Sequence, residues 1–292
     1  MPSNSEISAV RALIEKTAHN LAALGIASSR LDAEVMMAEA AAVTREAVIT
    51  GSIDLSPAIL KKFEAMVARR ERREPVAYIV GRKEFFSLDF EVSPAVLIPR
   101  PETEFVVTTA LECLAGKADA RVLDIGTGSG AIAIAIAVNA PSAQVTATDI
   151  SADALEVASR NARHHAVEDR IKLRRADCLD VLDGGAALGT FDVIVSNPPY
   201  LDDAEIAALE PEVGRFEPRV ALGGSVSSMR ILRSMASGAG AHLEAGGQLI
   251  MEVGTSHVAE VIGILMLAGL RIADVINDLA GQMRVLRAKV GT

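Results

Sequence analysis

The chain has 292 residues, half of them apolar, and a formal net charge of -9. This length exceeds what one hydrophobic core usually serves, so one large domain and a smaller one are expected. The acidic balance argues against non-specific binding along nucleic acid, where lysine and arginine neutralise phosphates. Apolar runs such as residues 131–138 stay far below the roughly 18 residues that a membrane helix needs. The first residues lack the basic and apolar regions of a signal peptide, and Cys113 and Cys178 are the only cysteines. We therefore expect a cytoplasmic protein without disulfides.

Residues 1–73 carry the pattern of a small all-α domain. Apolar positions recur at helical spacing before Gly25, and a second helix is expected over residues 30–42, with Ser28 or Ser29 as its N-cap. A third helix is expected from Pro57 to the charged cluster at residues 69–74. That cluster is either a solvated helix end or a docking patch for an acidic or RNA-linked partner.

Residues 74–101 are expected to form a linker with a β-hairpin. Partial alternation over residues 84–92 predicts one strand, and residues 95–98 are its candidate partner. Two prolines around Arg100 then make a stiff loop, and residues 99–104 open a helix that runs through Ala110. Thr103 is a candidate local cap of this helix, but loops of this kind also line functional sites.

Residues 102–292 are expected to form a Rossmann-like domain, because strands and helices alternate from residue 121 onward. A late strand pair predicts a hairpin that closes one sheet edge. The expected strands are residues 121–125, 144–148, 171–174, 191–196, 248–253, 271–277 and 283–288.

A glycine-rich loop, residues 124–130, follows the first of these strands and precedes a predicted helix over residues 131–138. Its glycines permit a tight turn and let the backbone approach a ligand at the helix N-terminus. Asp149, at the end of the next strand, is placed to accept hydrogen bonds from ribose hydroxyls, a device that dehydrogenases share. Asp177, after the third strand, is either an acceptor for an adenine amino group or a turn aspartate. These features leave hydride transfer and methyl transfer open.

The turn after the fourth strand decides between the two reactions. Asn197-Pro198-Pro199-Tyr200 must leave the sheet, since consecutive prolines cannot continue a ladder. The turn places a carboxamide, the Pro198 carbonyl and an aromatic ring at the strand's carboxyl end, where ligands bind in such sheets. An amide oxygen and a backbone carbonyl suit an –NH2 group, for which hydride transfer has no use. The sequence therefore predicts methyl transfer from S-adenosylmethionine to nitrogen, with Asn197, Pro198 and Tyr200 as catalytic residues.

Motifs spread over essentially the whole chain resemble those of one known family. They are residues 74–81 (Glu-Pro-Val-Ala-Tyr-Ile-Val-Gly), Phe85, residues 98–104 (Ile-Pro-Arg-Pro-Glu-Thr-Glu), 124–130, 197–200, 216–218 with 221–222, and 278–281 (Asp-Leu-Ala-Gly). The chain is similar in these motifs to the HemK/PrmC family of protein-(glutamine-N5) methyltransferases, which act on peptide chain release factors.

This resemblance implies an α/β protein: a Rossmann-like S-adenosylmethionine-dependent methyltransferase domain, a small N-terminal all-α domain and a β-hairpin linker. It implies the glutamine of a Gly-Gly-Gln motif as substrate. No cluster of residues has metal-ligand spacing, so we expect no metal ion; the short apolar runs predict no membrane partner, and the acidic charge argues against a nucleic-acid partner. We also expect a monomer. The implied cofactor-binding residues are Gly126, Thr127, Gly128, Ser129, Gly130, Asp149, Asp177, Cys178 and Asn197. The implied substrate-binding residues are Asn197, Pro198, Pro199, Tyr200 and Arg100, with Tyr200 or Pro199 packing on the amide plane.

Some segments depart from the family pattern. An Asp-Gly pair is usual where this chain has residues 223–229, and a glutamine is usual after the Glu-x-Gly strand end that here leads to His257. Two alternatives therefore stay open. One is an N-methyltransferase acting on a ribosomal-protein glutamine or a nucleic-acid amino group, and the other is a cofactor-binding protein without turnover.

Overall fold

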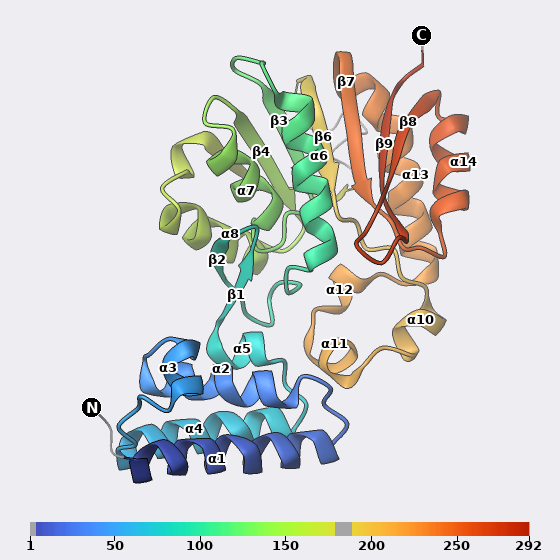
Figure 1. Cartoon of the computed structure of the whole chain (residues 1–292). Coiled ribbons are helices and arrows are strands. Elements are labelled where there is room, and N and C mark those ends of the chain that lie inside the picture. Colours follow the sequence, from blue (N-terminus) through green and yellow to red (C-terminus); the bar gives the residue numbers. More distant parts are fainter. Residues whose placement is uncertain (1–3, 179–188, 292) are drawn as a thin grey trace. The chain divides into compact units, whose positions relative to one another are not determined.

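The structure is a computed structural model that describes residues 4–178 and 189–291. The chain divides into two compact units, each described by itself (Figure 1). The helical unit comprises Met1–Gly81 and Glu210–Phe216, and the sheet unit comprises Arg82–Leu209 and Glu217–Thr292. The expected linker is thus divided, with residues 74–81 in the helical unit and 82–101 in the sheet unit. Among the helices of the described residues, none combines the length and apolar character of a membrane span.

The helical unit confirms that the first part of the chain is helical. Its core contains Val10, Leu21, Met36 and Phe63, all nearly inaccessible to solvent. Its helices are α1 (Asn4–Ala23), α2 (Ser29–Ala41), α3 (Arg45–Thr50), α4 (Pro57–Glu71), α5 (Val76–Val80) and α11 (Pro211–Phe216). α4 begins at Pro57, as expected, behind an N-cap serine whose hydroxyl accepts from the Ile59 N–H. α2 has Ser28 at its N-cap, but the Ser28 side chain makes no capping hydrogen bond.

In the charged cluster at residues 69–74, Glu71 and Arg72 are exposed, as expected for a solvated helix end, but Arg70 is buried. Arg70 is only 4% exposed, so it is neither solvated nor available to a partner. Its guanidinium donates to Asp32 at 2.7 Å and to Glu212 at 2.8 Å. Arg73 donates to Glu212 at 2.6 Å and 2.7 Å. These pairs hold the segment Glu210–Phe216 within the helical unit, and sequence spacing could not show them because Glu212 lies 139 residues after Arg73.

The sheet unit contains the predicted doubly wound sheet. Within the described residues, seven strands lie in the order β5-β4-β3-β6-β7-β9-β8. Strands β3 to β7 are parallel, and β9 runs antiparallel to both β7 and β8, which confirms the hairpin at the edge. The strands are β3 (Arg121–Ile125), β4 (Gln144–Asp149), β5 (Ile171–Arg175), β6 (Phe191–Ser196), β7 (Leu243–Glu252), β8 (Leu270–Asn277) and β9 (Met283–Val290).

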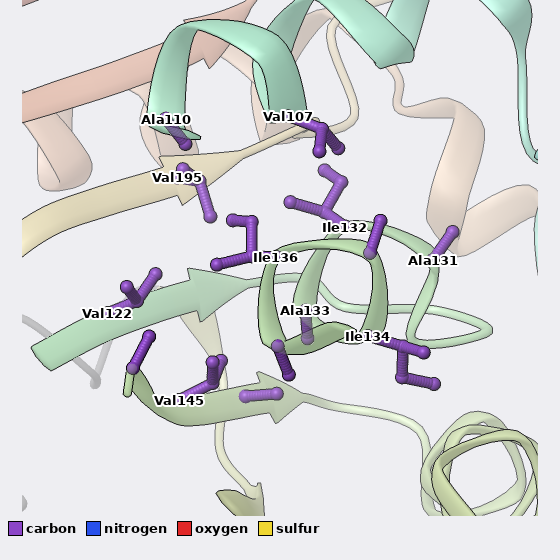
Figure 2. Packing of buried hydrophobic residues seen from close by; sticks show 14 of the residues in the cluster. Val107, Ala110, Val122, Ala131, Ile132, Ala133, Ile134, Ile136, Val145 and Val195 are labelled. Carbon is purple, nitrogen blue, oxygen red and sulfur yellow. The ribbon is translucent and has the colours of Figure 1, made fainter. Parts of the chain in front are cut away.

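Helices cover both faces of this sheet (Figure 1). Alternate residues of a strand point to opposite faces, so Val122 joins the core with α6 and α7 while Leu123 joins the core with α13 and α14. Figure 2 shows side chains of α7 between α6 and the strands. The helices are α6 (Glu104–Leu114), α7 (Ala131–Asn139), α8 (Ala152–His164), α10 (Asp203–Ala207), α12 (Arg219–Leu222), α13 (Ser225–His242) and α14 (Val258–Leu267), with short 3-10 turns at Pro101–Thr103 and Glu168–Arg170.

The expected pairing of residues 84–92 with residues 95–98 is wrong. The hairpin consists of β1 (Arg82–Phe85) and β2 (Leu88–Glu91), and residues 95–98 form no strand. The chain reverses at Phe86 and Ser87, whose φ angles are 53° and 59°. Two positive φ angles suit the tight turn that matches strand twist, but such turns usually carry glycine or asparagine. Because Phe86 stands where glycine or asparagine is usual, the sequence pattern did not predict this turn.

Candidate active site

The strand order brings the two principal motifs together. It reverses between β3 and β6, and ligands bind at such a point in open α/β sheets. Ile125, the last residue of β3, is paired with Ser196, the last residue of β6. The glycine loop and the Asn197 turn, which follow these two residues, therefore start side by side at one edge of the sheet.

A cavity of about 300 Å³ lies at this edge, wholly within the sheet unit. Most of the predicted site residues line it: Arg100, Gly126, Thr127, Gly128, Ser129, Asp149, Asp177, Cys178, Asn197 and Pro199. Gly130, Pro198 and Tyr200 are not among the lining residues, but Pro198 lies between Asn197 and Pro199, which both line the cavity.

The three glycines of the loop have different surroundings. Gly126 and Gly128 have φ angles of +75° and +56°, and a Cβ added to either would meet nothing within 4 Å. They therefore keep the backbone open on the cavity side, as a closely approaching ligand requires. A Cβ on Gly130 would lie 2.8 Å from Ile134 Cδ1 and 3.2 Å from Ala158 Cβ. Gly130 thus allows α8 to pack closely on α7, and the cofactor contact expected for it stays a prediction.

Asp149 orders the loop from the neighbouring strand. Its Oδ2 accepts from the Gly128 N–H and its Oδ1 from the Ser151 N–H, both at 2.9 Å. Burial raises the pKa of this carboxyl, and the backbone donors act against that shift. Each carboxylate oxygen can accept a further hydrogen bond, so Asp149 has the capacity to bind a diol.

The cavity is also lined by Asp177 and Cys178. Burial, together with the charges of Asp149 and Asp177, raises the pKa of the Cys178 thiol to about 12. The sulfur is therefore a neutral, weakly polar surface next to two acceptors. That combination suits a flat heterocycle with an amino group.

Asp124 lies beneath the loop and was singled out in the sequence only as its first residue. It is fully buried, and its Oδ2 accepts from the Thr127 hydroxyl at 2.6 Å. Its Oδ1 has no hydrogen-bond partner among the described residues. Burial raises its pKa to about 7. A carboxyl at the end of an apolar strand is the signal that sequence reasoning passed over.

Asn197 belongs to a chain of hydrogen bonds whose central pair, Thr103 and Glu252, is buried. Its Nδ2 donates to Thr103 Oγ1 at 3.1 Å, and Thr103 Oγ1 donates to Glu252 Oε2 at 2.6 Å. The Tyr200 hydroxyl donates to Glu252 Oε1 at 3.1 Å. Thr103 makes no capping hydrogen bond to α6, so its expected role as a local cap is wrong. Sequence reasoning missed the contact of Thr103 with Asn197 and the role of Glu252, although an acidic residue directly after the apolar run 249–251 was a usable signal.

Arg100 is fixed by another buried acid. Its Nη2 donates to Glu217 Oε1 at 2.5 Å, and the Ile98 N–H donates to Glu217 Oε2 at 3.1 Å. Burial raises the pKa of Glu217, while the nearby guanidinium of Arg100 acts in the opposite direction. Glu217 therefore holds the proline loop so that Arg100 lies in the cavity wall.

Three side chains with metal-binding atoms lie together near this site, namely Asp202, Glu205 and His257, with those atoms within 4.8 Å of one another. They already bind one another: Asp202 and Glu205 form a capping box at the start of α10. His257 Nε2 lies 3.0 Å from Glu205 Oε2. His257 therefore contacts the capping box of α10.

Comparison with known proteins identifies the family. The PrmC N-terminal domain model matches residues 12–81, and the methyltransferase small domain model matches residues 106–210. The release factor glutamine methyltransferase of Xylella fastidiosa (strain Temecula1) is 43% identical over 261 residues, which cover 88% of this chain and 91% of that protein. The enzyme of the same name from Geobacter sulfurreducens is 37% identical over 292 residues, covering 100% of both chains. The chain belongs to the release factor glutamine methyltransferase family.

Solved structures are similar to this chain in fold. A ribosomal protein L11 methylase from Lactobacillus delbrueckii subsp. bulgaricus matches with a TM-score of 0.50 and 22% identity, covering 69% of this chain and 84% of that one. A methyltransferase from Pyrococcus furiosus matches with a TM-score of 0.51 and 20% identity, covering 78% of this chain and 98% of that one. At these identities the likeness shows the fold alone, which is that of Rossmann-like methyltransferases.

Proposed function

We propose that this chain transfers a methyl group from S-adenosylmethionine to the side-chain amide nitrogen, N5, of the glutamine in the Gly-Gly-Gln motif of a peptide chain release factor. The observation that carries this proposal is the cavity at the β3–β6 edge. There the glycine loop and the carboxamide of Asn197 line one space, in a chain that belongs to this family.

The cavity residues fit the cofactor. The backbone of the loop, open at Gly126 and Gly128, would hold the methionine part, and Asp149 would accept from the ribose hydroxyls. Asp177 and Cys178 would border the adenine. When bound, the cofactor supplies an electrophilic methyl group on a sulfonium. No step in this scheme requires a metal ion, so a chelator should leave the rate unchanged.

The Asn197 turn would hold the substrate. An amide nitrogen is a weak nucleophile because its lone pair is delocalised into the carbonyl. Two acceptors, Asn197 Oδ1 and the Pro198 carbonyl, would bind the two N–H bonds and favour positive charge on nitrogen as it attacks. They would also hold the nitrogen in line with the methyl group. Pro199 lines the cavity and would pack on the amide plane, whereas the hydroxyl of Tyr200 is bound to Glu252.

No general base is assigned. The proton on the nitrogen becomes acidic once the methyl group is attached, and it can leave to water. The histidines with contacts among the described residues are bound elsewhere; His165 lies 2.8 Å from the Asp89 carbonyl, and His257 is bound to Glu205.

The test is methyl transfer from radiolabelled S-adenosylmethionine to a purified release factor, a ribosomal protein fraction or DNA. Label on the Gly-Gly-Gln peptide, abolished when the substrate glutamine is changed to asparagine, is the expected result. Label only on ribosomal protein or on DNA would refute the proposal in favour of the other N-methyltransferase. Cofactor binding without transfer to any of them would show a protein without turnover.

Asn197→Ala separates substrate binding from cofactor binding. Because the carboxamide is assigned to the substrate amide, we expect transfer to fall on the order of 10²- to 10³-fold, as when one transition-state hydrogen bond is lost. The affinity for S-adenosylmethionine, measured by calorimetry, should stay within about threefold, well under the tenfold that 1.4 kcal/mol represents. An equal loss of both would show that Asn197 mainly shapes the cofactor pocket.

We further propose that the enzyme works in the cytoplasm as a monomer, where release factors meet it as substrates. A light-scattering mass near 30.6 kDa is the expected result. A mass of twice that value would refute the monomer.

A further inference from the structure

The hydrogen bonds behind Asn197 have a fixed direction. Asn197 and Tyr200 of one turn, together with Thr103 and Glu252 from two other segments of the sheet unit, form one continuous chain of hydrogen bonds. Thr103 and Glu252 are 4% and 2% exposed, so water does not compete for their hydrogen bonds. The direction of each bond is therefore decided by the chemistry of the partners alone.

Both oxygens of Glu252 accept hydrogen bonds, one from Thr103 and one from Tyr200, as the oxygens of a carboxylate do. Burial raises the pKa of Glu252, while the hydrogen bonds from Thr103 and Tyr200 and the charge of Arg284 act in the opposite direction. The single hydroxyl hydrogen of Thr103 is donated to Glu252 Oε2, over a short distance of 2.6 Å. Thr103 Oγ1 is then left with lone pairs only, so it can meet Asn197 solely as an acceptor. The group of Asn197 that faces Thr103 must be its NH2, as observed.

The other end of the same carboxamide is thereby assigned to the cavity. Asn197 lines the cavity, and no hydrogen bond among the described residues uses its Oδ1. If the carboxamide were rotated by half a turn, its NH2 would face the substrate –NH2, and the acceptor would be lost. Both Oδ1 towards the cavity and NH2 towards Thr103 follow from the role of Glu252 as the acceptor of the Thr103 hydroxyl hydrogen.

We propose that Glu252 and Thr103 are positioning residues: through the Thr103 hydroxyl, Glu252 fixes the orientation of the Asn197 carboxamide and so makes the site an acceptor for –NH2. The inference rests on the proposed function, because it assigns the substrate amide to Asn197. The same orientation accounts for a preference between two substrates. An acceptor facing the substrate favours glutamine over glutamate, whose carboxylate offers no N–H.

Tyr200 holds Glu252 at the other end of this chain of hydrogen bonds. Its hydroxyl donates to the second oxygen of Glu252. Its ring lies against Gly254, where an added Cβ would be 3.0 Å from Tyr200 Cδ2. With one oxygen bound to Thr103 and the other to Tyr200, the Glu252 carboxylate cannot turn away from Thr103 without breaking both bonds.

The first experiment compares Thr103→Val with Thr103→Ser. Valine keeps the shape but removes the hydroxyl, so the carboxamide loses its fixed orientation, and kcat should fall on the order of 10²-fold. Serine restores the hydroxyl and should restore kcat to within about threefold of wild type, less than the tenfold that 1.4 kcal/mol represents. The matched control is Thr109→Val, since Thr109 is equally buried but donates only to the Phe105 carbonyl of its own helix. That control should leave transfer unchanged.

A second readout distinguishes orientation from simple damage. Unlabelled Gly-Gly-Gln and Gly-Gly-Glu peptides compete with the release factor, and the ratio of their inhibition constants measures the preference for an amide. In Thr103→Val the ratio should shrink about tenfold, because a freed carboxamide can turn its NH2 to the carboxylate. A purely structural role would weaken both peptides alike and leave the ratio unchanged.

The third variant tests the role of Glu252 as the acceptor of the Thr103 hydroxyl hydrogen. In Glu252→Gln, the new NH2 faces Thr103 and the new carbonyl accepts from Tyr200, since the opposite arrangement leaves the Tyr200 hydroxyl without an acceptor. Thr103 must then donate to Asn197, which reverses the carboxamide, so transfer should fall about as far as in Thr103→Val. Adding Tyr200→Phe removes that constraint and lets the carbonyl face Thr103. The double variant Glu252→Gln/Tyr200→Phe should therefore transfer faster than Glu252→Gln alone.

The outcomes separate this inference from the proposed function. A wild-type enzyme that methylates no release factor overturns the proposed function and the inference with it. If the wild-type enzyme does methylate a release factor, two results overturn the inference alone. One is an unchanged kcat in Thr103→Val, and the other is a double variant that is slower than Glu252→Gln. A loss of cofactor affinity that matches the loss of kcat also overturns the inference, because the hydrogen-bonded chain behind Asn197 would then shape the cofactor pocket.

Discussion

Gly130 and Gly128 offer a direct test of how the glycine loop is built. Both residues have positive φ angles, +82° and +56°, but their surroundings differ. A methyl group on Gly130 would meet Ile134 and Ala158, whereas one on Gly128 would enter open space beside the cavity. We therefore predict that Gly130→Ala lowers the stability of the fold and that Gly128→Ala lowers cofactor affinity.

The magnitudes follow from the contacts. Placing alanine in a left-handed conformation costs about 1–2 kcal/mol at either position. At Gly130 the added Cβ also lies 2.8 Å from Ile134 Cδ1 and 3.2 Å from Ala158 Cβ. Overpacking of this kind costs about 1–3 kcal/mol, lowered where the flexible Ile134 side chain can move. The smaller conformational entropy of unfolded alanine favours both variants equally and cancels in the comparison.

The assay is urea unfolding of wild type and both variants, together with calorimetric titration of S-adenosylmethionine. Because the chain has no tryptophan, far-ultraviolet circular dichroism is the suitable probe. Gly130→Ala should be less stable than Gly128→Ala by about 1–3 kcal/mol. Gly128→Ala should lose affinity by about tenfold or more, equivalent to at least 1.4 kcal/mol. Equal stability of the two variants, or a loss of affinity in Gly130→Ala without a loss of stability, would refute the packing role assigned to Gly130.

Two further predictions concern buried charges. The pKa of Asp124 is about 7 in the folded protein against 3.8 in the unfolded chain, so between these pH values the folded state binds more protons and the free energy of unfolding falls as pH rises. Asp124→Asn should flatten this slope in urea titrations from pH 4.5 to 8, and an unchanged slope would show that another group causes it. Glu212→Ala leaves the Arg73 guanidinium and one nitrogen of Arg70 without their carboxylate, so the helical unit should lose about 2 kcal/mol or more and become sensitive to limited proteolysis. The control is Asp203→Ala, because both residues of the Arg219–Asp203 pair are exposed and the pair should contribute less than about 1 kcal/mol to stability. Similar losses of stability in both variants would contradict the role given to Glu212.

Local sequence signals were sufficient for much of the sheet unit. The expected bounds of β3 and β6 agree with the structure residue by residue, because each is a short apolar run ended by a turn of glycine or proline. The glycine loop and the Asn197 turn were found for the same reason, as each is a contiguous motif whose backbone requirements only a few residue types satisfy. β7 was predicted too short at its start, since the glycines at 246 and 247 resemble a turn.

The sequence by itself thus determined the alternating fold, the cavity motifs and the family. The tertiary structure alone decided that Gly130 packs against α8, that Arg70 is buried, and that Asn197 reaches Glu252 through Thr103. The physical reason is distance along the chain. Asn197 lies 94 residues from Thr103, and Thr103 lies 149 residues from Glu252. Only the placement of β6 between β3 and β7, with α6 packed near their ends, brings these side chains within hydrogen-bonding distance, and no local pattern encodes that order.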